Sequence, residues 1–96
     1  MKISELQEDS RKVDLEATVI EKSNSREVRS RYTNETYRVA DFTIEDETGT
    51  VKLVLWNEQI DQVNVDNKVK VENGYVKTFR GEIQLNIGKY GTLIVL

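Results

Sequence analysis

The sequence predicts an all-β domain in which five strands close into a small Greek-key barrel, with a short helix between strands three and four and a short N-terminal helical turn. Several segments alternate apolar and polar residues, which is the period of a strand with one buried face. The 96 residues suffice for one hydrophobic core, and no proline interrupts them. Closing so few strands into a barrel removes the free edges that the alternative, an open sandwich, would keep.

The N-terminal half supplies a helical turn and two strands. Residues 4–7, SELQ, fit the capping-box pattern and predict a short helical turn. Residues 13–19 alternate and form the first strand. Residues 23–35 have no sustained period and are rich in Ser, Asn and Arg, which indicates a strand end and an exposed loop. Residues 37–46 form the second strand, which turns Ala40, Phe42 and Ile44 inward and Val39, Asp41, Thr43 and Glu45 outward.

A third strand follows the turn DETG at residues 46–49, whose glycine is free to adopt positive φ. The strand spans residues 50–56 and turns its odd-numbered residues inward as far as Leu55. Trp56 therefore falls on the outer face, together with Lys52 and Val54.

A short helix and a bent fourth strand come next. Asn57 is expected to cap a helix at residues 58–63, in which Ile60 and Val63 can close one end of the barrel. The fourth strand begins at Val69, and Asn73-Gly74 inside it indicates a bulge or a sharp bend.

The stretch NGYVKTFRGEIQLNIG, residues 73–88, predicts a β-hairpin with a two-residue turn at Arg80-Gly81. The expected pairs are Phe79 with Glu82, Thr78 with Ile83, Lys77 with Gln84, Val76 with Leu85, and Tyr75 with Asn86. One face of this hairpin, expected to point inward, carries Val76, Thr78, Ile83 and Leu85, whereas the other face carries two aromatic rings with a lysine between them.

This arrangement of strands and helix is typical of the five-stranded Greek-key barrel called the OB-fold. We therefore expect residues 1–96 to form a single OB-fold domain. The apolar run that ends abruptly at Leu96 suggests one domain of a longer protein.

Composition excludes several function classes. The chain has no cysteine and no histidine, which removes disulfides, thiol nucleophiles and imidazole bases; we expect no metal, no cofactor and no enzymatic activity. No apolar run approaches the roughly 20 residues that span a bilayer, and the N-terminus lacks a signal-peptide core, so a cytoplasmic protein is expected.

The charge is unevenly distributed along the chain. The net charge is −3, which by itself argues against a nucleic-acid partner. However, residues 41–66 hold seven acidic residues and one lysine, whereas residues 23–40 and 67–96 are both net basic. A fold that joins the two basic segments would have a positive groove, with the acidic segment facing away or helping to reject duplex nucleic acid.

The outer faces of strands three to five carry the residues with the clearest functional pattern. Trp56, Tyr75 and Phe79 are set there among lysines, and aromatic rings in a basic groove suit single-stranded nucleic acid because every base has a face to stack. The cations expected to contact phosphates are Arg26, Arg29, Arg31, Lys52, Lys77, Arg80 and Lys89.

Each of these residues also has a purely structural interpretation. Trp56 at a strand end can be a partly buried packing residue, and Tyr75 can cover the bulge beside it. Arginines in an exposed loop are often only solvated. The acidic run at residues 45–47 lacks the spacing of a calcium loop and is read as a solvated turn.

Three stretches resemble the OB-fold domains of archaeal replication protein A and related small single-stranded DNA-binding proteins. These are ISEL at residues 3–6, EDETGTVKLVLW at 45–56 and NGYVKTFRGEIQL at 73–85. The resemblance implies that Trp56, Tyr75 and Phe79 stack on bases. Relatives often place a further aromatic residue where this chain has Asn86. Asn86 and Tyr90, which lies nearby in the sequence, are therefore additional candidates for the site.

The resemblance implies binding of single-stranded DNA with little sequence preference during replication, repair or recombination. Other OB domains of the same protein and replication or repair proteins are the further partners it implies. Two alternatives stay open: an RNA-binding module of the tRNA anticodon-binding type, and an OB domain used only for protein contacts.

Overall fold

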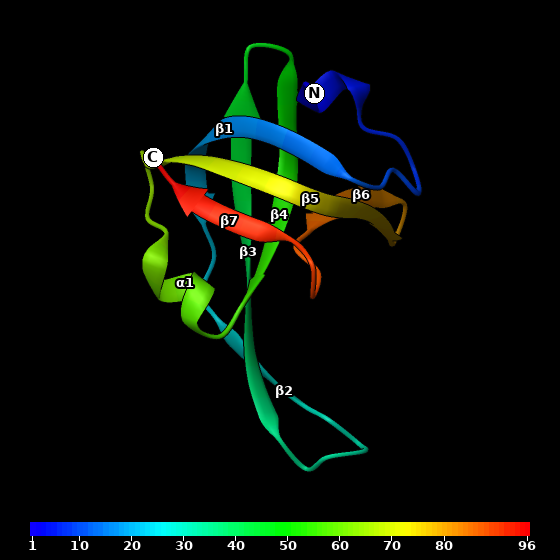
Figure 1. The fold of residues 1–96 in the computed structure, drawn as a ribbon. Coiled ribbons are helices and arrows are strands. Elements are labelled where there is room, and N and C mark those ends of the chain that lie inside the picture. Colours follow the sequence, from blue (N-terminus) through cyan, green and yellow to red (C-terminus); the bar gives the residue numbers. More distant parts are fainter.

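The fold is a closed five-stranded sheet of the OB type, as the sequence predicts (Figure 1). The computed structural model describes residues 1–96. In chain order its elements are η1 (Ile3–Glu5), β1 (Val13–Lys22), β2 (Arg26–Arg29), β3 (Thr36–Asp46), β4 (Gly49–Trp56), α1 (Glu58–Gln62), β5 (Lys68–Phe79), β6 (Glu82–Asn86) and β7 (Thr92–Val95). The strands pair in a ring in the order β1, β3, β4, β6, β5 and back to β1, with only β4 and β6 parallel. This closure rules out the open sandwich.

Two further strands lie outside the ring. β7 pairs with the first half of β5. β2 pairs with the start of β3, and the two project from the barrel as a long hairpin (Figure 1). The prediction of an irregular segment at residues 23–35 is therefore wrong for Arg26–Arg29. All four residues of β2 are exposed, so no apolar alternation marks the strand in the sequence.

The inward residues of the ring form one core, as the alternation predicts. Phe42, Ile44, Leu53, Leu55 and Leu85 are all fully buried in it. Two outward-facing valines, Val39 and Val54, are also buried, contrary to the prediction, and they line the floor of a groove described below. Thr78 is exposed rather than inward, because the tip of the β5–β6 hairpin extends past the core.

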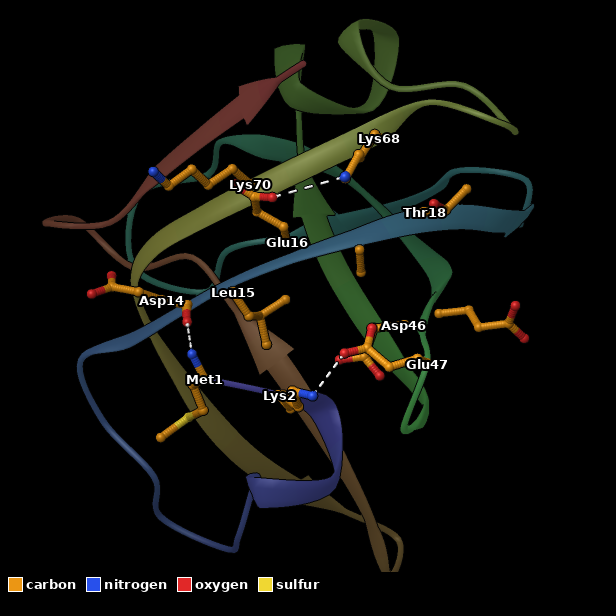
Figure 2. A pocket seen from close by; sticks show the side chains of 12 residues that line it. Met1, Lys2, Asp14, Leu15, Glu16, Thr18, Asp46, Glu47, Lys68 and Lys70 are labelled. Carbon is orange, nitrogen blue, oxygen red and sulfur yellow. Dashed lines mark hydrogen bonds and ion pairs between the residues drawn. The ribbon is translucent and has the colours of Figure 1, made fainter.

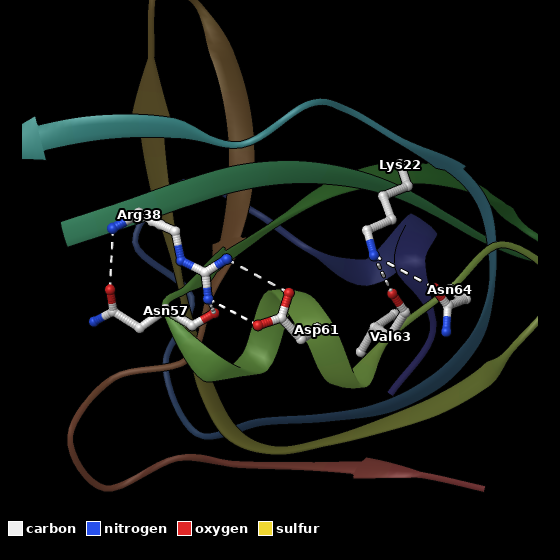
Figure 3. A network of polar contacts seen from close by, with 6 residues as sticks. All are labelled: Lys22, Arg38, Asn57, Asp61, Val63 and Asn64. Atoms are coloured by element: carbon white, nitrogen blue, oxygen red, sulfur yellow. Dashed lines mark hydrogen bonds and ion pairs between the residues drawn. The ribbon is translucent and has the colours of Figure 1, made fainter.

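Ile60 of helix α1 and Val63, the residue after the helix, are buried and close one end of the barrel, as expected; the helix ends one residue before the predicted end at 63. Asn57 occupies the N-cap position, as predicted, but its side chain makes no capping bond: its Oδ1 accepts the backbone N–H of Arg38 at 3.0 Å. The Arg38 guanidinium donates to Asn57 O at 3.2 Å and to Asp61 Oδ2 at 2.8 Å (Figure 3). These bonds hold the residue after Trp56 against β3.

None of the helices has the length and apolar character needed to cross a membrane.

The N-terminal helical turn begins two residues earlier than the capping box predicts, with Lys2 rather than Ser4 at the N-cap position. It spans Ile3–Glu5, and Glu5 Oε1 accepts the N–H of Lys2 at 2.8 Å. The β3–β4 turn supplies the other acceptors, because Asp46 Oδ2 accepts the N–H of Ile3 at 2.8 Å and Thr48 Oγ1 accepts the N–H of Ser4 at 3.0 Å. Long-range acceptors thus satisfy the N–H groups that the local bond between Glu5 and Lys2 leaves free.

Asp46 should make the fold sensitive to acid. Burial raises the pKa of this carboxyl, but hydrogen bonds from the Thr48 hydroxyl and from the backbone amides of Ile3, Thr48 and Gly49 outweigh it and hold the pKa below its usual 3.8. Because the folded pKa is below the unfolded one, the ionised carboxylate stabilises the fold above the unfolded pKa. This stability is lost as the pH falls through the folded pKa.

We therefore expect the free energy of unfolding to decline below about pH 4, as measured by urea denaturation from pH 7 to 3. Asp46→Asn should be less stable at pH 7 and should show a shallower decline. An unchanged pH profile in this variant would contradict the role of Asp46.

The β5–β6 hairpin has the predicted register at all five pairs, from Tyr75 with Asn86 to Phe79 with Glu82. The two-residue turn is also as predicted, with φ of 52° at Arg80 and 81° at Gly81, as in a type I′ turn. The predicted bulge at Asn73-Gly74 is confirmed by a register shift against β1, while β5 runs through it unbroken.

Gly81→Ala is expected to destabilise the domain by about 1–2 kcal/mol, because an L-residue with a β-carbon is strained at positive φ. No atom lies within 4 Å of a β-carbon built at this position, so the cost is confined to the backbone. Chemical denaturation measures it. Gly81→Asn should cost less, since asparagine tolerates this conformation, and equal losses in the two variants would contradict the backbone explanation.

Candidate nucleic-acid interface

A groove crosses the outer faces of β3, β4 and the β5–β6 hairpin, and β2 borders it. We call it the central groove; its volume is about 560 Å³. The residues lining it include six of the ten predicted stacking and cationic residues: Arg26, Lys52, Trp56, Lys77, Phe79 and Arg80. Trp56 is 39% exposed and Phe79 is 55% exposed, so both rings retain surface that a planar ligand can cover. Strand parity brings them together, as predicted.

Trp56 is oriented by a residue that the sequence analysis missed. Tyr37, at the start of β3, meets the Trp56 ring edge to face, with 6.5 Å between ring centroids and an interplanar angle of 84°. The Tyr37 hydroxyl donates to Glu35 Oε2 at 2.6 Å. Strand parity could have identified Tyr37, because it lies two residues before Val39 and therefore on the same outward face of β3.

The cations of the central groove are of two kinds. Arg26 Nη1 lies 3.5 Å from Asp41 Oδ2, and Lys52 Nζ lies 3.5 Å from Glu82 Oε2. Lys77 and Arg80 have no carboxylate oxygen within 4.0 Å. The latter two are therefore free to pair with an anion.

Asp41 is an exception to the expectation that the acidic segment faces away from the groove. It follows the buried Ala40 on β3, so parity turns it outward into the groove, where it also meets Arg26. Its other oxygen, Oδ1, is buried and has no hydrogen-bond partner.

Tyr75 shares the outward face of β5 with Lys77 and Phe79 but lines a neighbouring hollow, in which Lys89 and Tyr90 also lie. Lys77 lines both depressions. The Tyr75 ring packs on Gly88, where an added β-carbon would approach Tyr75 Cε1 to 2.8 Å. With 36% of Tyr75 exposed, the residue is both a packing residue and an accessible ring.

The remaining predicted residues lie elsewhere or contribute differently. Asn86 is only 9% exposed and lines the central groove, and its Nδ2 donates to Gln84 O at 3.3 Å. Arg29 ends β2 with side-chain parity opposite to that of Arg26, and Arg31 lies in the turn at the tip of the β2–β3 hairpin. Neither arginine lines the groove.

A third depression, the acidic hollow, lies over β1 and the first half of β5 and contains Asp14, Glu16, Glu45, Asp46 and Glu47 (Figure 2). Lys2 pairs with Glu47 at 2.9 Å, and Lys68 Nζ lies 3.9 Å from a Glu16 oxygen. No group of three or more acidic side chains is arranged to hold a metal ion. The excess of carboxylates makes this face a poor partner for phosphates.

The ring of five strands with an aromatic-lined outer groove defines the chain as an OB-fold domain. Residues 10–95 match the family model for single-stranded DNA binding protein Ssb-like, OB fold, and the chain belongs to this family.

The relatives agree with this assignment. The chain is 31% identical over 87 residues to the single-stranded DNA binding protein Ssb of Saccharolobus solfataricus; the match covers 91% of this chain and 57% of that protein. The second OB-fold domain of replication protein A from Methanococcus maripaludis superimposes with a TM-score of 0.79 at 24% identity, covering 100% of this chain and 93% of that one. A hypothetical protein from Arabidopsis thaliana gives 0.82 at 23% identity, covering 100% and 72%. At 23–24% sequence identity, the last two structural similarities show that the fold is shared.

Proposed function

We propose that this domain binds single-stranded DNA with little sequence preference in replication, repair or recombination, and catalyses no reaction. The observation that carries the proposal is the central groove, where half-exposed Trp56 and Phe79 lie with the unpaired cations Lys77 and Arg80. Stacking of a base on an aromatic side chain contributes ~1–3 kcal/mol and tolerates any base, while cations follow the phosphates. Membership in the Ssb-like family supports the choice of single-stranded DNA.

We assign each predicted residue a role according to where it lies relative to the central groove. Trp56, Phe79 and Tyr75 stack on bases. Lys77 and Arg80 contact phosphates directly, whereas Arg26 and Lys52 do so by exchanging a carboxylate partner for a phosphate. Arg29 and Arg31 lie outside the groove, so they contact only DNA that continues from the groove along the β2–β3 hairpin.

The chain spans little more than half the length of the Saccharolobus solfataricus relative. We propose that it works beside further segments or OB domains and with replication or repair proteins. Tethering a second binding unit would raise the effective concentration of the strand and add affinity that one short groove lacks.

The proposal is tested by measuring the fluorescence anisotropy of labelled oligo-dT, oligo-U and tRNA, and of a duplex of equal length. We expect oligo-dT to bind at low salt, the duplex to bind far more weakly, and affinity to fall as salt rises. Preference for oligo-U or tRNA would favour the anticodon-type alternative. Absence of all binding at low salt would overturn the proposal and favour a protein-docking domain.

Glu82→Gln is expected to strengthen oligo-dT binding up to about fivefold at low salt, because it frees Lys52 and removes a negative charge from the groove. The gain should shrink as salt screens the charges. Anisotropy titrations at two salt concentrations measure it. Glu16→Gln, which removes the same charge from the acidic hollow, is the matched control. Equal effects of the two substitutions would contradict a local role for Glu82.

A further inference from the structure

The hollow beside the central groove also contains aromatic rings, and its lining is more basic than that of the central groove. We call it the lateral hollow and define it by Arg11, Lys12, Tyr75, Lys77, Lys89 and Tyr90. Asp9 is the only acidic residue that lines it. None of the four cations has a carboxylate oxygen within 4.0 Å. Four unpaired positive charges against one negative charge make the hollow attractive to a polyanion.

Two aromatic rings face this hollow. Tyr75 is 36% exposed and Tyr90 is 81% exposed, and Lys89 Nζ lies 5.9 Å from the centre of the Tyr90 ring. The large exposure of Tyr90 means that burial does not account for the position of its ring. Rings interleaved with cations are the combination that single-stranded nucleic acid requires.

Hydrogen bonds fix the three segments that form the hollow. The N–H of Val76 donates to Ser10 O at 2.8 Å, which ties the residues before β1 to β5. Asn73 Nδ2 donates to Tyr90 O at 3.2 Å, and the N–H of Gly91 donates to Gly88 O at 3.0 Å, so the β6–β7 loop is held over the β5 bulge. The hollow is therefore formed before any ligand arrives.

We propose that the lateral hollow binds the continuation of the same DNA strand that occupies the central groove. Lys77 forms a wall common to both, and Phe79 and Tyr75 are four residues apart on one face of β5, about 13 Å along the strand. Bases that leave the central groove stack on Tyr75 and Tyr90, while Arg11, Lys12 and Lys89 hold the phosphates. This inference rests on the proposed function and adds Arg11 and Lys12 to its binding residues.

The test compares a short oligo-dT of about four nucleotides with a long one of about twelve. The double variant Arg11→Gln/Lys12→Gln should keep the affinity of the wild type for the short oligonucleotide and lose affinity for the long one, about tenfold at low salt. Its plot of log affinity against log salt for the long oligonucleotide should flatten by about 1.4, since each single-strand phosphate contact contributes roughly 0.7. Tyr90→Ala should also weaken only the long complex.

Matched controls carry the same changes elsewhere. Lys68→Gln/Lys70→Gln removes two cations at the acidic hollow, and Tyr32→Ala removes a ring that is 97% exposed at the tip of the β2–β3 hairpin. If the Arg11/Lys12 variant binds the long oligonucleotide as tightly as these controls do, the inference is wrong while the central groove stands. If Trp56→Ala/Phe79→Ala also leaves binding of the two oligonucleotides unchanged, the proposed function itself fails.

Discussion

Replacing Trp56 and Phe79 together by alanine is expected to reduce the affinity for a short oligo-dT by about 30-fold or more. Each ring that stacks on a base contributes ~1–3 kcal/mol, and every 1.4 kcal/mol is about a factor of ten. Both rings line the central groove and are partly exposed, so truncation removes stacking surface and little core packing. Anisotropy of a labelled oligonucleotide measures the loss, because the variant has no tryptophan to follow.

The control for this experiment is Tyr32→Ala, since Tyr32 lies outside both the central groove and the lateral hollow. Thermal unfolding should show that the double variant keeps its fold. Unchanged affinity in a folded double variant would mean that the strand does not stack in this groove.

Phe42→Ala is expected to lower the free energy of unfolding by about 3–5 kcal/mol. Phe42 is fully buried and belongs to β3, where it pairs with Lys22 of β1 on one side and Leu53 of β4 on the other. Truncation leaves a cavity at the centre of a close-packed core, and a domain of this size has only about 5–15 kcal/mol to lose.

Guanidinium chloride denaturation measures this loss, with the exposed Tyr32→Ala as a reference that should change stability by less than about 0.5 kcal/mol. A loss below about 1 kcal/mol for Phe42→Ala would contradict the assignment of Phe42 to the centre of the core.

Much of the barrel was predictable because burial on one face imposes a period of two. The inward residues of β1, β3 and β4 follow from alternation alone. The β5–β6 register follows because any one-residue slip would move Leu85 out of the core and Tyr75 into it. The same parity correctly placed Trp56 and Phe79 on one outer surface.

The features that escaped prediction depend on contacts between distant segments. β2 has no buried face, so only its pairing with β3 reveals it. The N-terminal turn begins where Asp46 can accept the N–H of Ile3, a bond across 43 residues. The division of Tyr75 and Phe79 between two depressions depends on the β6–β7 loop, which packs Gly88 against the Tyr75 ring.

The most direct test of stacking in the central groove is a titration of oligo-dT followed through the fluorescence of Trp56, the single tryptophan of the chain. A base stacked on the indole should quench its emission in a saturable way at low salt. The same titration of Phe79→Ala should give a similar final quench at a much higher oligonucleotide concentration. Emission that stays constant while anisotropy reports binding would place the strand away from Trp56 and contradict the account.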